Sequence, residues 1–390
     1  MYTLLNDDGP IAKQNQGAVV PPIYQNSLFT FDSWDDIDQA FDDFSDSYIY
    51  SRINNPTAKY AEEKIALLCG GEKAKLTASG ISAIVAAVMH CVKSGDHIIT
   101  IHNVYGPTNN FLSQYLNNYG ITTTFVKGTS IHDFINAAQP NTRLIFLESP
   151  ASMTYELQDL DAVAQFAKSA NIKTVIDNTW ASPLYQKPLE IGIDIEVHSV
   201  SKYISGHSDI VAGAIISDKE TINQIIKNEI ALLGAKIAPF EAWLILRSLR
   251  TLPLRMKKHS KNTKKIIAFL ESHPMVRKII FPGIPSFEQY ELGKKQMSGY
   301  SGLLSFELNT DDISMVKSFI NALKLIKLGV SWGGHESLVY SPTISYSKEL
   351  TPEQFQAMNI KVGMVRISIG LESAKDLVAD LRQALDGVTG

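Results

Sequence analysis

The sequence is poor in cysteine, in long apolar runs and in clustered charge, and each shortage removes a class of protein. The 390-residue chain has two cysteines, too few for a disulfide scaffold, which fits a reducing compartment. No apolar run approaches membrane-spanning length, and Asp7 and Asp8 stand where a signal peptide would be positive. Basic residues are dispersed and the net charge is -4, so nothing indicates nucleic-acid binding. We expect a cytoplasmic protein with no nucleic-acid or membrane partner.

The chain also lacks the glycine-rich fingerprints G-x-G-x-x-G and G-x-x-x-x-G-K-[ST] of common nucleotide sites. What it does contain, from Pro56 on, is an alternation of helical and strand patterns. Residues 56–69 are expected to form a helix, because proline suits a first helical turn and Gly70-Gly71 suits a stop. Further helices are expected at 82–91 and 108–118, and strands at 73–78, 97–101, 122–126, 143–147, 174–177, 194–197 and 213–217. This order predicts an α/β fold with a mostly parallel central sheet, helices on both faces and ligands at the carboxyl ends of the strands.

Three segments are expected along the chain. Residues 1–48 are polar and weakly periodic and predict an N-terminal arm, with an acidic stretch at 32–46 as a solvated face. Residues 49–238 hold the alternating pattern and predict the large domain. Residues 239–390 predict a smaller C-terminal α+β domain, reached by a long helix through Trp243, Leu246, Leu249 and Leu252, with strands near 302–308 and 364–368.

The most informative segment is His198-Ser199-Val200-Ser201-Lys202-Tyr203, which places a lysine among small hydroxyls. Upstream, Asp177 ends an apolar strand. A lysine amine can form an imine with the aldehyde of pyridoxal 5'-phosphate (PLP), and the hydroxyls of Ser199 and Ser201 can bind its phosphate. The Asp177 carboxylate can pair with the pyridinium nitrogen and keep the ring an electron sink. The segment alone is a weak signal, because most lysines are solvated surface charges.

Three more segments offer groups suited to a phosphate or a flat ring. Ser79-Gly80-Ile81 joins an expected strand to an expected helix, and free amides at a helix start bind phosphate; the alternative is an ordinary turn. Tyr50 and Arg52 point the same way in an extended chain and could converge on one phosphate, or belong to a plain edge strand. Tyr105, in a loop after a strand, can stack on a cofactor or plug the loop.

Near the C-terminus, Arg366 stands inside an otherwise apolar strand. A charge there is unusual unless it is paired, so Arg366 is either a clamp for an amino-acid carboxylate or part of a buried ion pair. Ser331-Trp332 opens a glycine-rich loop. His198 and His207 are nine residues apart and do not share a helical face, so we expect structural histidines and no metal site.

Together and in this order, the motifs resemble the Cys/Met metabolism (cystathionine-metabolism) family of PLP-dependent enzymes, over about residues 16–385. The resemblance implies PLP fold type I, similar to aspartate aminotransferase. It implies that Lys202 holds the cofactor and shuttles protons, that Asp177 pairs with the ring nitrogen and that Tyr105 stacks on the ring. The implied phosphate ligands are Ser79, Gly80, Ile81, Ser199 and Ser201, with Tyr50 and Arg52 from a neighbouring subunit. Such a shared site implies a homotetramer built from dimers.

Particular residues bear on which family member this is. Ser152, within Glu148-Ser149-Pro150-Ala151-Ser152-Met153, and Trp332 in Ser331-Trp332-Gly333-Gly334 resemble bacterial cystathionine β-lyases. Cystathionine γ-lyases and γ-synthases typically carry Glu where this chain has Val330. Methionine γ-lyases also carry an apolar residue there, but usually have Cys at the position of Pro107. Residues 54–57, Asn-Asn-Pro-Thr, resemble the γ-acting branch.

The activity predicted on this basis is α,β-elimination of L-cystathionine to homocysteine, pyruvate and ammonia, within the sulfur amino-acid metabolism of methionine biosynthesis. Lys202, Tyr105 and Tyr50 are the expected catalytic residues, and Ser152, Ser331, Trp332 and Arg366 are expected to contact a small sulfur amino acid. The alternatives are γ-elimination by a methionine or cystathionine γ-lyase, a cystathionine γ-synthase-like transfer, and a cysteine-S-conjugate β-lyase. A PLP-binding regulatory protein is the non-enzyme alternative.

Overall fold

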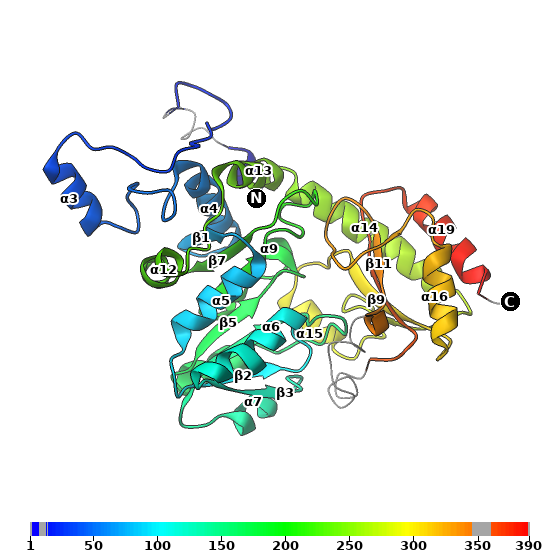
Figure 1. Ribbon diagram of the computed structural model, residues 1–390. Helices are drawn as coiled ribbons and strands as arrows, with labels where there is room; N and C mark the ends of the chain where they lie inside the picture. Colours follow the sequence, from blue (N-terminus) through cyan, green and yellow to red (C-terminus); the bar gives the residue numbers. More distant parts are fainter. Residues whose placement is uncertain (1, 8–12, 14, 345–359, 389–390) are drawn as a thin grey trace.

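Two β-sheets with helices packed around them organise the protein (Figure 1). The computed structural model describes residues 2–7, 13, 15–344 and 360–388. The larger sheet has seven strands in the order β1-β7-β6-β5-β4-β2-β3, and the smaller has five in the order β10-β11-β12-β9-β8. The first lies in the blue-to-green part of the chain and the second in the yellow-to-red part. The expected α/β fold with a smaller second sheet is therefore confirmed; the exact domain boundaries stay a prediction.

The larger sheet is mostly parallel, as expected. Strands β3, β2, β4, β5 and β6 run parallel to one another, whereas β7 is antiparallel to both of its neighbours, β6 and β1. Each strand lies within a residue or two of its expected range: β1 Lys73–Thr77, β2 His97–Ile101, β3 Thr122–Val126, β4 Thr142–Glu148, β5 Lys173–Asp177, β6 Ile195–Ser199 and β7 Gly213–Ser217. Because the parallel strands end at one edge, the loops after β2, β4, β5 and β6 gather there.

The helices of this part follow the strands in sequence: α4 Pro56–Cys69, α5 Gly80–Cys91, α6 Gly106–Asn110, α7 Ile131–Ala137, α8 Leu160–Ser169, α9 Ser182–Tyr185, α10 Pro188–Ile191, α11 Lys219–Ile225, the π-helical turn η3 Ile226–Ile230 and α12 Ala231–Leu233. The single helix expected at 108–118 is different in the structure. It starts at Gly106, with Pro107 in its first turn, and α6 passes into a π-helical turn, η1 (Phe111–Tyr115), and a 3-10 turn, η2 (Leu116–Tyr119). Proline favours that earlier start because a first helical turn needs no N–H from it.

The long helix expected after Pro239 is two helices, α13 (Pro239–Leu249) and α14 (Leu252–Glu271). Pro253 stands in the first turn of α14 and has no N–H to donate to the carbonyl of Leu249, four residues earlier, where α13 ends. Beyond α14 come β8 Val276–Ile280, α15 Tyr290–Gln296, β9 Leu303–Leu308, α16 Ile313–Ala322, β10 Lys327–Leu328, β11 Leu338–Tyr340, the short turn η4 Pro342–Ile344, β12 Met364–Ser368 and α19 Ala374–Asp386.

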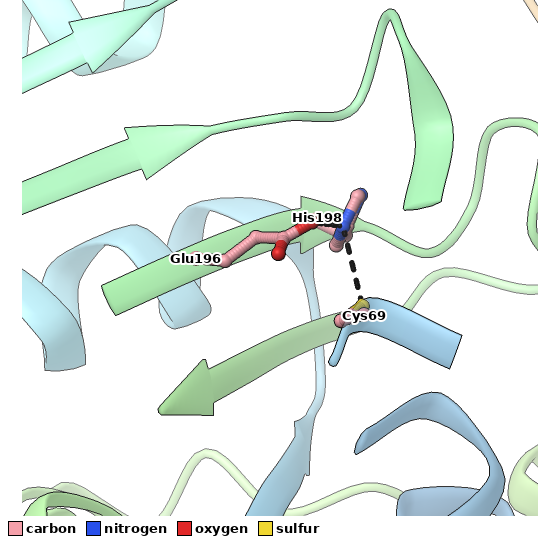
Figure 2. A group of neighbouring side chains, drawn as sticks. All are labelled: Cys69, Glu196 and His198. Carbon is pink, nitrogen blue, oxygen red and sulfur yellow. Dashed lines mark hydrogen bonds and ion pairs between the residues drawn. The ribbon is translucent and has the colours of Figure 1, made fainter. Parts of the chain in front are cut away.

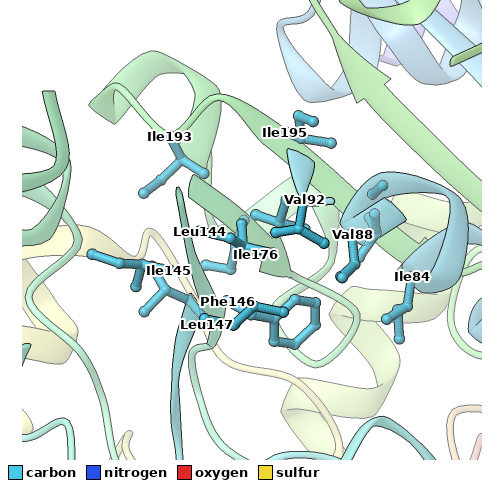
Figure 3. Close-up of a cluster of buried hydrophobic side chains, with 14 of the residues drawn as sticks. Ile84, Val88, Val92, Leu144, Ile145, Phe146, Leu147, Ile176, Ile193 and Ile195 are labelled. Atoms are coloured by element: carbon cyan, nitrogen blue, oxygen red, sulfur yellow. The ribbon is translucent and has the colours of Figure 1, made fainter. Parts of the chain in front are cut away.

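Helix α5 carries much of the core of the large sheet. Its residues Ala83, Ile84, Ala87 and Val88 recur at helical spacing and are buried. Figure 3 shows Ile84 and Val88 on this helix facing strand side chains that include Phe146. Each fully buried aliphatic or aromatic side chain contributes about 1.5–3 kcal/mol to stability. The packing of these side chains against the strands therefore holds α5 in place and sets where its first turn lies relative to the strand ends.

The N-terminal segment is attached to the large part, and its Leu5 side chain is buried in the core there. The carbonyls of Leu4 and Asp7, at the end of α1 (Tyr2–Asn6), accept hydrogen bonds from Lys64 Nζ at 2.7 and 2.6 Å. The acidic stretch forms a helix, α3 (Trp34–Asp42), which stands apart from the sheets in Figure 1. Within the described residues, no helix combines the length and apolar character that a membrane crossing requires.

Candidate active site

Lys202 lies in the turn after β6, where the two sheets meet. Its Nζ donates a hydrogen bond to Ser331 Oγ at 2.7 Å and lies 5.4 Å from the ring centre of Trp332. Burial, followed by the positive charge of Arg366, lowers the pKa of Lys202 to about 8. The negative charge of Asp177 acts in the other direction and raises this pKa. A lysine with this pKa is a usable base near neutral pH. The structure thus brings Ser331 and Trp332 beside Lys202, as expected.

The loop that carries Ser331 approaches Lys202 closely because of one glycine. Gly333 has φ +82°, and a Cβ on it would lie 3.0 Å from the Tyr203 nitrogen and 3.2 Å from the Lys202 carbonyl carbon. A side chain would therefore be strained in conformation and crowded against the lysine turn. This requirement keeps Ser331 within reach of the amine.

Asp177 ends β5 on the same edge of the sheet and is buried. It accepts hydrogen bonds from the Thr179 N–H at 2.9 Å and from the Thr179 hydroxyl. Burial raises the pKa of Asp177, and the Thr179 bonds and the charges of His198 and Lys202 oppose that rise. Thr179 Oγ1 also accepts from the Ser199 N–H at 2.8 Å. Thr179, which the sequence did not single out, therefore fastens the ends of β5 and β6 together.

The expected phosphate seat is a capped helix start. The Ser79 hydroxyl accepts from the Ser82 N–H at 3.1 Å, and the Ser82 hydroxyl accepts from the Ser79 N–H at 3.0 Å. This reciprocal cap uses the third amide of α5 and leaves the N–H groups of Gly80 and Ile81 without an intrahelical acceptor. A Cβ on Gly80 would lie 2.7 Å from the Ser199 Cβ. Gly80 therefore lets the helix start approach Ser199, which forms the opposite wall.

The hydroxyl of Ser201, a predicted phosphate ligand, contacts the main chain of Ala212. Its Oγ accepts from the Ala212 N–H at 3.0 Å and donates to the Ala212 carbonyl at 3.3 Å. These bonds tie the lysine turn to the segment leading into β7. A direct role of Ser201 toward the phosphate stays a prediction.

Arg366 lies on β12 at the border between the two sheets. Its Nη2 donates to the Val330 carbonyl at 2.5 Å, its Nη1 lies 3.7 Å from Met153 Sδ, and its guanidinium lies 5.1 Å from the Tyr340 ring centre. The charge of Arg366 acts on both Lys202 and the Tyr105 phenol. Arg366 therefore contributes a positive charge that both Lys202 and Tyr105 feel.

Tyr105 precedes α6 and keeps nearly half of its surface exposed. Its N–H donates to Glu148 Oε2 at 2.7 Å. Burial, followed by the negative charges of Asp177 and Glu148, raises the pKa of the Tyr105 phenol. Ser152 donates its hydroxyl hydrogen bond to Glu148 Oε1, so Tyr105 and Ser152 meet at one carboxyl group.

Tyr50 and Arg52 are extended only in part. Tyr50 forms an antiparallel bridge with Leu28, and the chain then enters a turn closed by a 2.9 Å hydrogen bond from the Ile53 N–H to the Tyr50 carbonyl. The Arg52 guanidinium lies 5.8 Å from the Tyr50 ring centre and donates to the Ala231 carbonyl. The turn forms because Asn55, the cap of α4, follows at once and sends the chain into that helix.

A buried polar cluster that the sequence did not reveal includes Glu196 and His198 on β6, the strand that leads to Lys202. His198 Nε2 lies 2.6 Å from Glu196 Oε1 and 3.8 Å from Cys69 Sγ (Figure 2). The same carboxylate oxygen accepts from Asn178 Nδ2 at 2.7 Å. Asn178 follows Asp177, so this cluster joins the ends of β5 and β6 from the opposite face. The signal available in the sequence was two polar residues, 196 and 198, on one face of an apolar strand.

The residues present fit PLP. Gly80 and Ser199 form a cradle that a Cβ would fill, and α5 presents amides suited to a phosphate. Asp177 supplies an acidic group suited to a pyridine nitrogen, and Lys202 an amine suited to an aldehyde.

Comparison with known proteins agrees with this fit. The family of Cys/Met metabolism PLP-dependent enzymes matches residues 3–386. The chain is 40% identical over 377 residues to the L-methionine gamma-lyase of Porphyromonas gingivalis (strain ATCC BAA-308 / W83), covering 95% of this chain and 94% of the relative. It is 38% identical over 378 residues to the cystathionine gamma-lyase of Dictyostelium discoideum, covering 97% and 95%.

Among solved structures, the cystathionine gamma-lyase of Lactobacillus plantarum complexed with L-serine matches with a TM-score of 0.92 and 34% identity, over 100% of this chain and 99% of the other. These relatives support the γ-acting alternative better than the cystathionine β-lyase predicted from the sequence. The chain belongs to the family of Cys/Met metabolism PLP-dependent enzymes and is a PLP-dependent carbon–sulfur lyase.

Proposed function

We propose that the protein is a γ-eliminating lyase that converts L-methionine and water to methanethiol, 2-oxobutyrate and ammonia. The observation that carries this choice is Val330. Its side chain is 75% exposed, its carbonyl accepts from Arg366, and it precedes Ser331, the partner of Lys202. An isopropyl group at this place offers an apolar contact to a thioether methyl and no acceptor for the distal amine of cystathionine.

The relatives support the same choice, because several L-methionine gamma-lyases match almost the whole chain at 36–40% identity. Pro107, where methionine γ-lyases usually carry Cys, stands against it. The second candidate remains cystathionine β-elimination, favoured by Ser152 and Trp332.

The roles of the residues follow from their positions. Bound in the cradle, PLP supplies an aldehyde for the substrate amine and a conjugated ring that accepts electrons. Arg366 binds the substrate carboxylate with its guanidinium, which fixes the amino acid between Lys202 and Tyr105. Lys202, held by Ser331, accepts the Cα proton, and a positioned base of this kind contributes about 10²–10⁴-fold to the rate. Asp177 would pair its carboxylate with the ring nitrogen.

The amine of Lys202 has a second task in γ-elimination, because a proton must also leave Cβ before the sulfur leaves Cγ. Lys202 Nζ lies beside Ser331 and the indole of Trp332. The amine would have to pass on the Cα proton and become neutral again before it could accept the proton from Cβ. The Tyr105 phenol, whose pKa is raised, remains protonated at neutral pH and can give its proton to the departing sulfur.

We infer that the working unit is a homotetramer of two dimers, in which Tyr50 and Arg52 reach the phosphate of a neighbouring subunit. The support is that Arg52 stands on a turn beside Ala231, away from the described contacts of Lys202 in its own chain.

The deciding experiment is to incubate the purified, PLP-loaded protein with L-methionine or L-cystathionine and to identify the oxo acid and the thiol by mass spectrometry. 2-Oxobutyrate with methanethiol from methionine supports the proposal. Pyruvate with homocysteine from cystathionine, and no turnover of methionine, would move the protein to the β-lyase reaction. Lys202→Ala is the control and should be inactive with both substrates while keeping the fold.

A further inference from the structure

Two buried carboxyl groups stand side by side at the floor of the site. Glu148 ends β4 and Asp177 ends β5, and the two residues are paired in the register of these neighbouring parallel strands. Their exposed fractions are 7% and 9%. Paired residues of adjacent strands project from the same face of the sheet, so both carboxyl groups face the loops that carry Tyr105 and Lys202. Only Asp177 is needed to face a pyridine nitrogen, which leaves Glu148 without a role.

Glu148 joins two loops of the site. One oxygen accepts from the Tyr105 N–H at 2.7 Å, and the other accepts from the Ser152 hydroxyl. The same two loops meet again where the Ser152 N–H donates to the Asn103 carbonyl at 3.1 Å and where Asn103 Nδ2 donates to Thr154 Oγ1 at 2.8 Å. Glu148 is therefore the point at which the loop after β2 and the loop after β4 are attached to the sheet.

The surroundings of Glu148 favour its neutral form. Burial, followed by the charge of Asp177, raises the pKa of Glu148 to about 8, and the bonds from Ser152 and Tyr105 only partly oppose this. The titratable group on the neighbouring strand is Asp177, and the one on the facing loop is the Tyr105 phenol. The charges of Lys202 and His198 act on Asp177, and that of Arg366 acts on Tyr105. Two adjacent buried carboxyl groups do not both ionise readily.

We propose that Glu148 is a positioning residue that works as a neutral carboxylic acid and fixes the main chain of Tyr105 and the Ser152 loop over the PLP ring. A carboxylic acid has an oxygen for the Tyr105 N–H and a hydroxyl for Ser152, whose own hydroxyl can donate or accept. Asp177 is then the one ionised carboxyl group of the two and can pair with the ring nitrogen. The inference rests on the family's cofactor and not on the choice of sulfur substrate.

The test compares Glu148→Gln, which copies the neutral acid, with Glu148→Ala, which removes both hydrogen bonds. The matched control is Glu156→Gln, in the same loop, where the carboxylate is held by Thr154 and Asn103 instead. The first readout is the PLP dissociation constant of the full-length protein after cofactor removal. We expect Glu148→Gln and Glu156→Gln to stay within about threefold of the wild type, and Glu148→Ala to bind about tenfold more weakly or worse.

The second readout is the melting temperature of the cofactor-free protein between pH 5 and pH 8. A carboxyl group with a raised pKa holds its proton in the folded state, so its contribution to stability falls as the pH rises from about 4.5 to about 8. The Gln variant has no such loss. The melting temperature of Glu148→Gln, relative to the wild type, should therefore rise across this range.

Two results would overturn the proposal. If Glu148→Gln binds PLP as weakly as Glu148→Ala, or if its relative melting temperature does not change with pH, Glu148 acts as an anion. If Glu148→Ala binds PLP as well as the wild type, Glu148 positions nothing. Neither readout uses turnover, so each is independent of whether methionine or cystathionine is the substrate.

Discussion

Lys202 and Ser331 are joined by a 2.7 Å hydrogen bond from Nζ to Oγ, although 129 residues separate them. The bond links the turn after β6 to the loop that follows β10, and so makes the position of the catalytic amine depend on both sheets. Among the described residues, Ser331 accepts the hydrogen bond of this amine and the Trp332 ring lies beside it. The alignment of the amine with a substrate proton is thus a property of how the two parts pack.

Ser331→Ala should therefore lower kcat more than it raises KM. Removing a hydrogen bond to a charged or catalytic amine costs about 1.5–3 kcal/mol, or roughly tenfold to a hundredfold if all of it is felt in the transition state. Steady-state kinetics with the preferred substrate would measure this. Ser169→Ala, at the exposed end of α8, is the matched control and should change neither constant. An unchanged kcat in Ser331→Ala would show that the bond does not orient Lys202.

Arg366 should influence how readily Lys202 loses its proton. Burial lowers the pKa of Lys202 to about 8, and the charge of Arg366 is the next cause. The rate at which the cofactor-free protein captures PLP should rise with pH through about 8, because only the neutral amine attacks an aldehyde. In Arg366→Ala the midpoint should move upward, whereas Arg277→Ala, on the exposed pair with Asp311, should leave it in place. Stopped-flow absorbance would follow the capture, and an unmoved midpoint in Arg366→Ala would contradict the coupling.

The parts of this site that local sequence patterns could reveal are those at strand ends. Asp177 and Ser79 are predicted because each stands where an apolar strand ends, at the ligand-binding edge of a parallel sheet. Lys202 is predicted from the small hydroxyls that flank it, and its place after a strand agrees with that rule. The same rule would have found Glu148, which also ends an apolar strand, had two adjacent carboxyl groups been weighed together. Thr179 was missed because its role appears only once β5 and β6 are side by side.

Contacts between distant segments were beyond local patterns. That Arg366 and Ser331 meet Lys202 depends on the packing of the two sheets, and in the sequence only a family resemblance indicates it. Tyr50 and Arg52 show how far a local inference reaches. Tyr50 keeps the extended geometry in its bridge to Leu28, but Arg52 lies in the turn that precedes Asn55, the cap of α4.

Asp177→Asn should separate cofactor binding from turnover. The cradle of Gly80 and Ser199 is unchanged in this variant, so part of the PLP affinity should remain. Turnover should fall by about 10²-fold or more, because an amide carries no negative charge to pair with a protonated ring nitrogen. Equilibrium PLP titration and kcat would be measured together, with Asp161→Asn on the surface of α8 as the control. Full activity in Asp177→Asn would contradict the assigned role.

The proposal that Arg52 serves a neighbouring subunit makes a prediction about mixtures of inactive subunits. Arg52→Ala and Lys202→Ala damage different chains' contributions to one site, so a mixed dimer regains one intact site. After unfolding and refolding of an equal mixture, about a quarter of the wild-type activity is expected from random pairing. Lys202→Ala mixed with Asp177→Asn is the control, because both residues belong to the same chain's site and no intact site can form. If the first mixture recovers no activity, Arg52 does not serve a neighbouring subunit.

The cluster of Cys69, Glu196 and His198 should matter for stability as well as for the site. Glu196 and His198 are almost fully buried and lie 2.6 Å apart, and Glu196 also holds Asn178, which follows Asp177. His198→Ala leaves the buried Glu196 side chain with one hydrogen-bond partner fewer, which costs about 1–3 kcal/mol. Urea unfolding of the cofactor-free protein would measure the loss.

Lys294→Ala, which breaks the exposed pair with Glu291, is the comparison for that experiment and should cost about 1 kcal/mol or less. A loss in His198→Ala as small as in Lys294→Ala would show that the cluster adds nothing to folding. If stability falls as expected, PLP affinity should fall with it, because the cluster and Thr179 hold the same two strand ends from opposite faces. A stability loss without any change in PLP affinity would show that the cluster stabilises the core but does not support the PLP site.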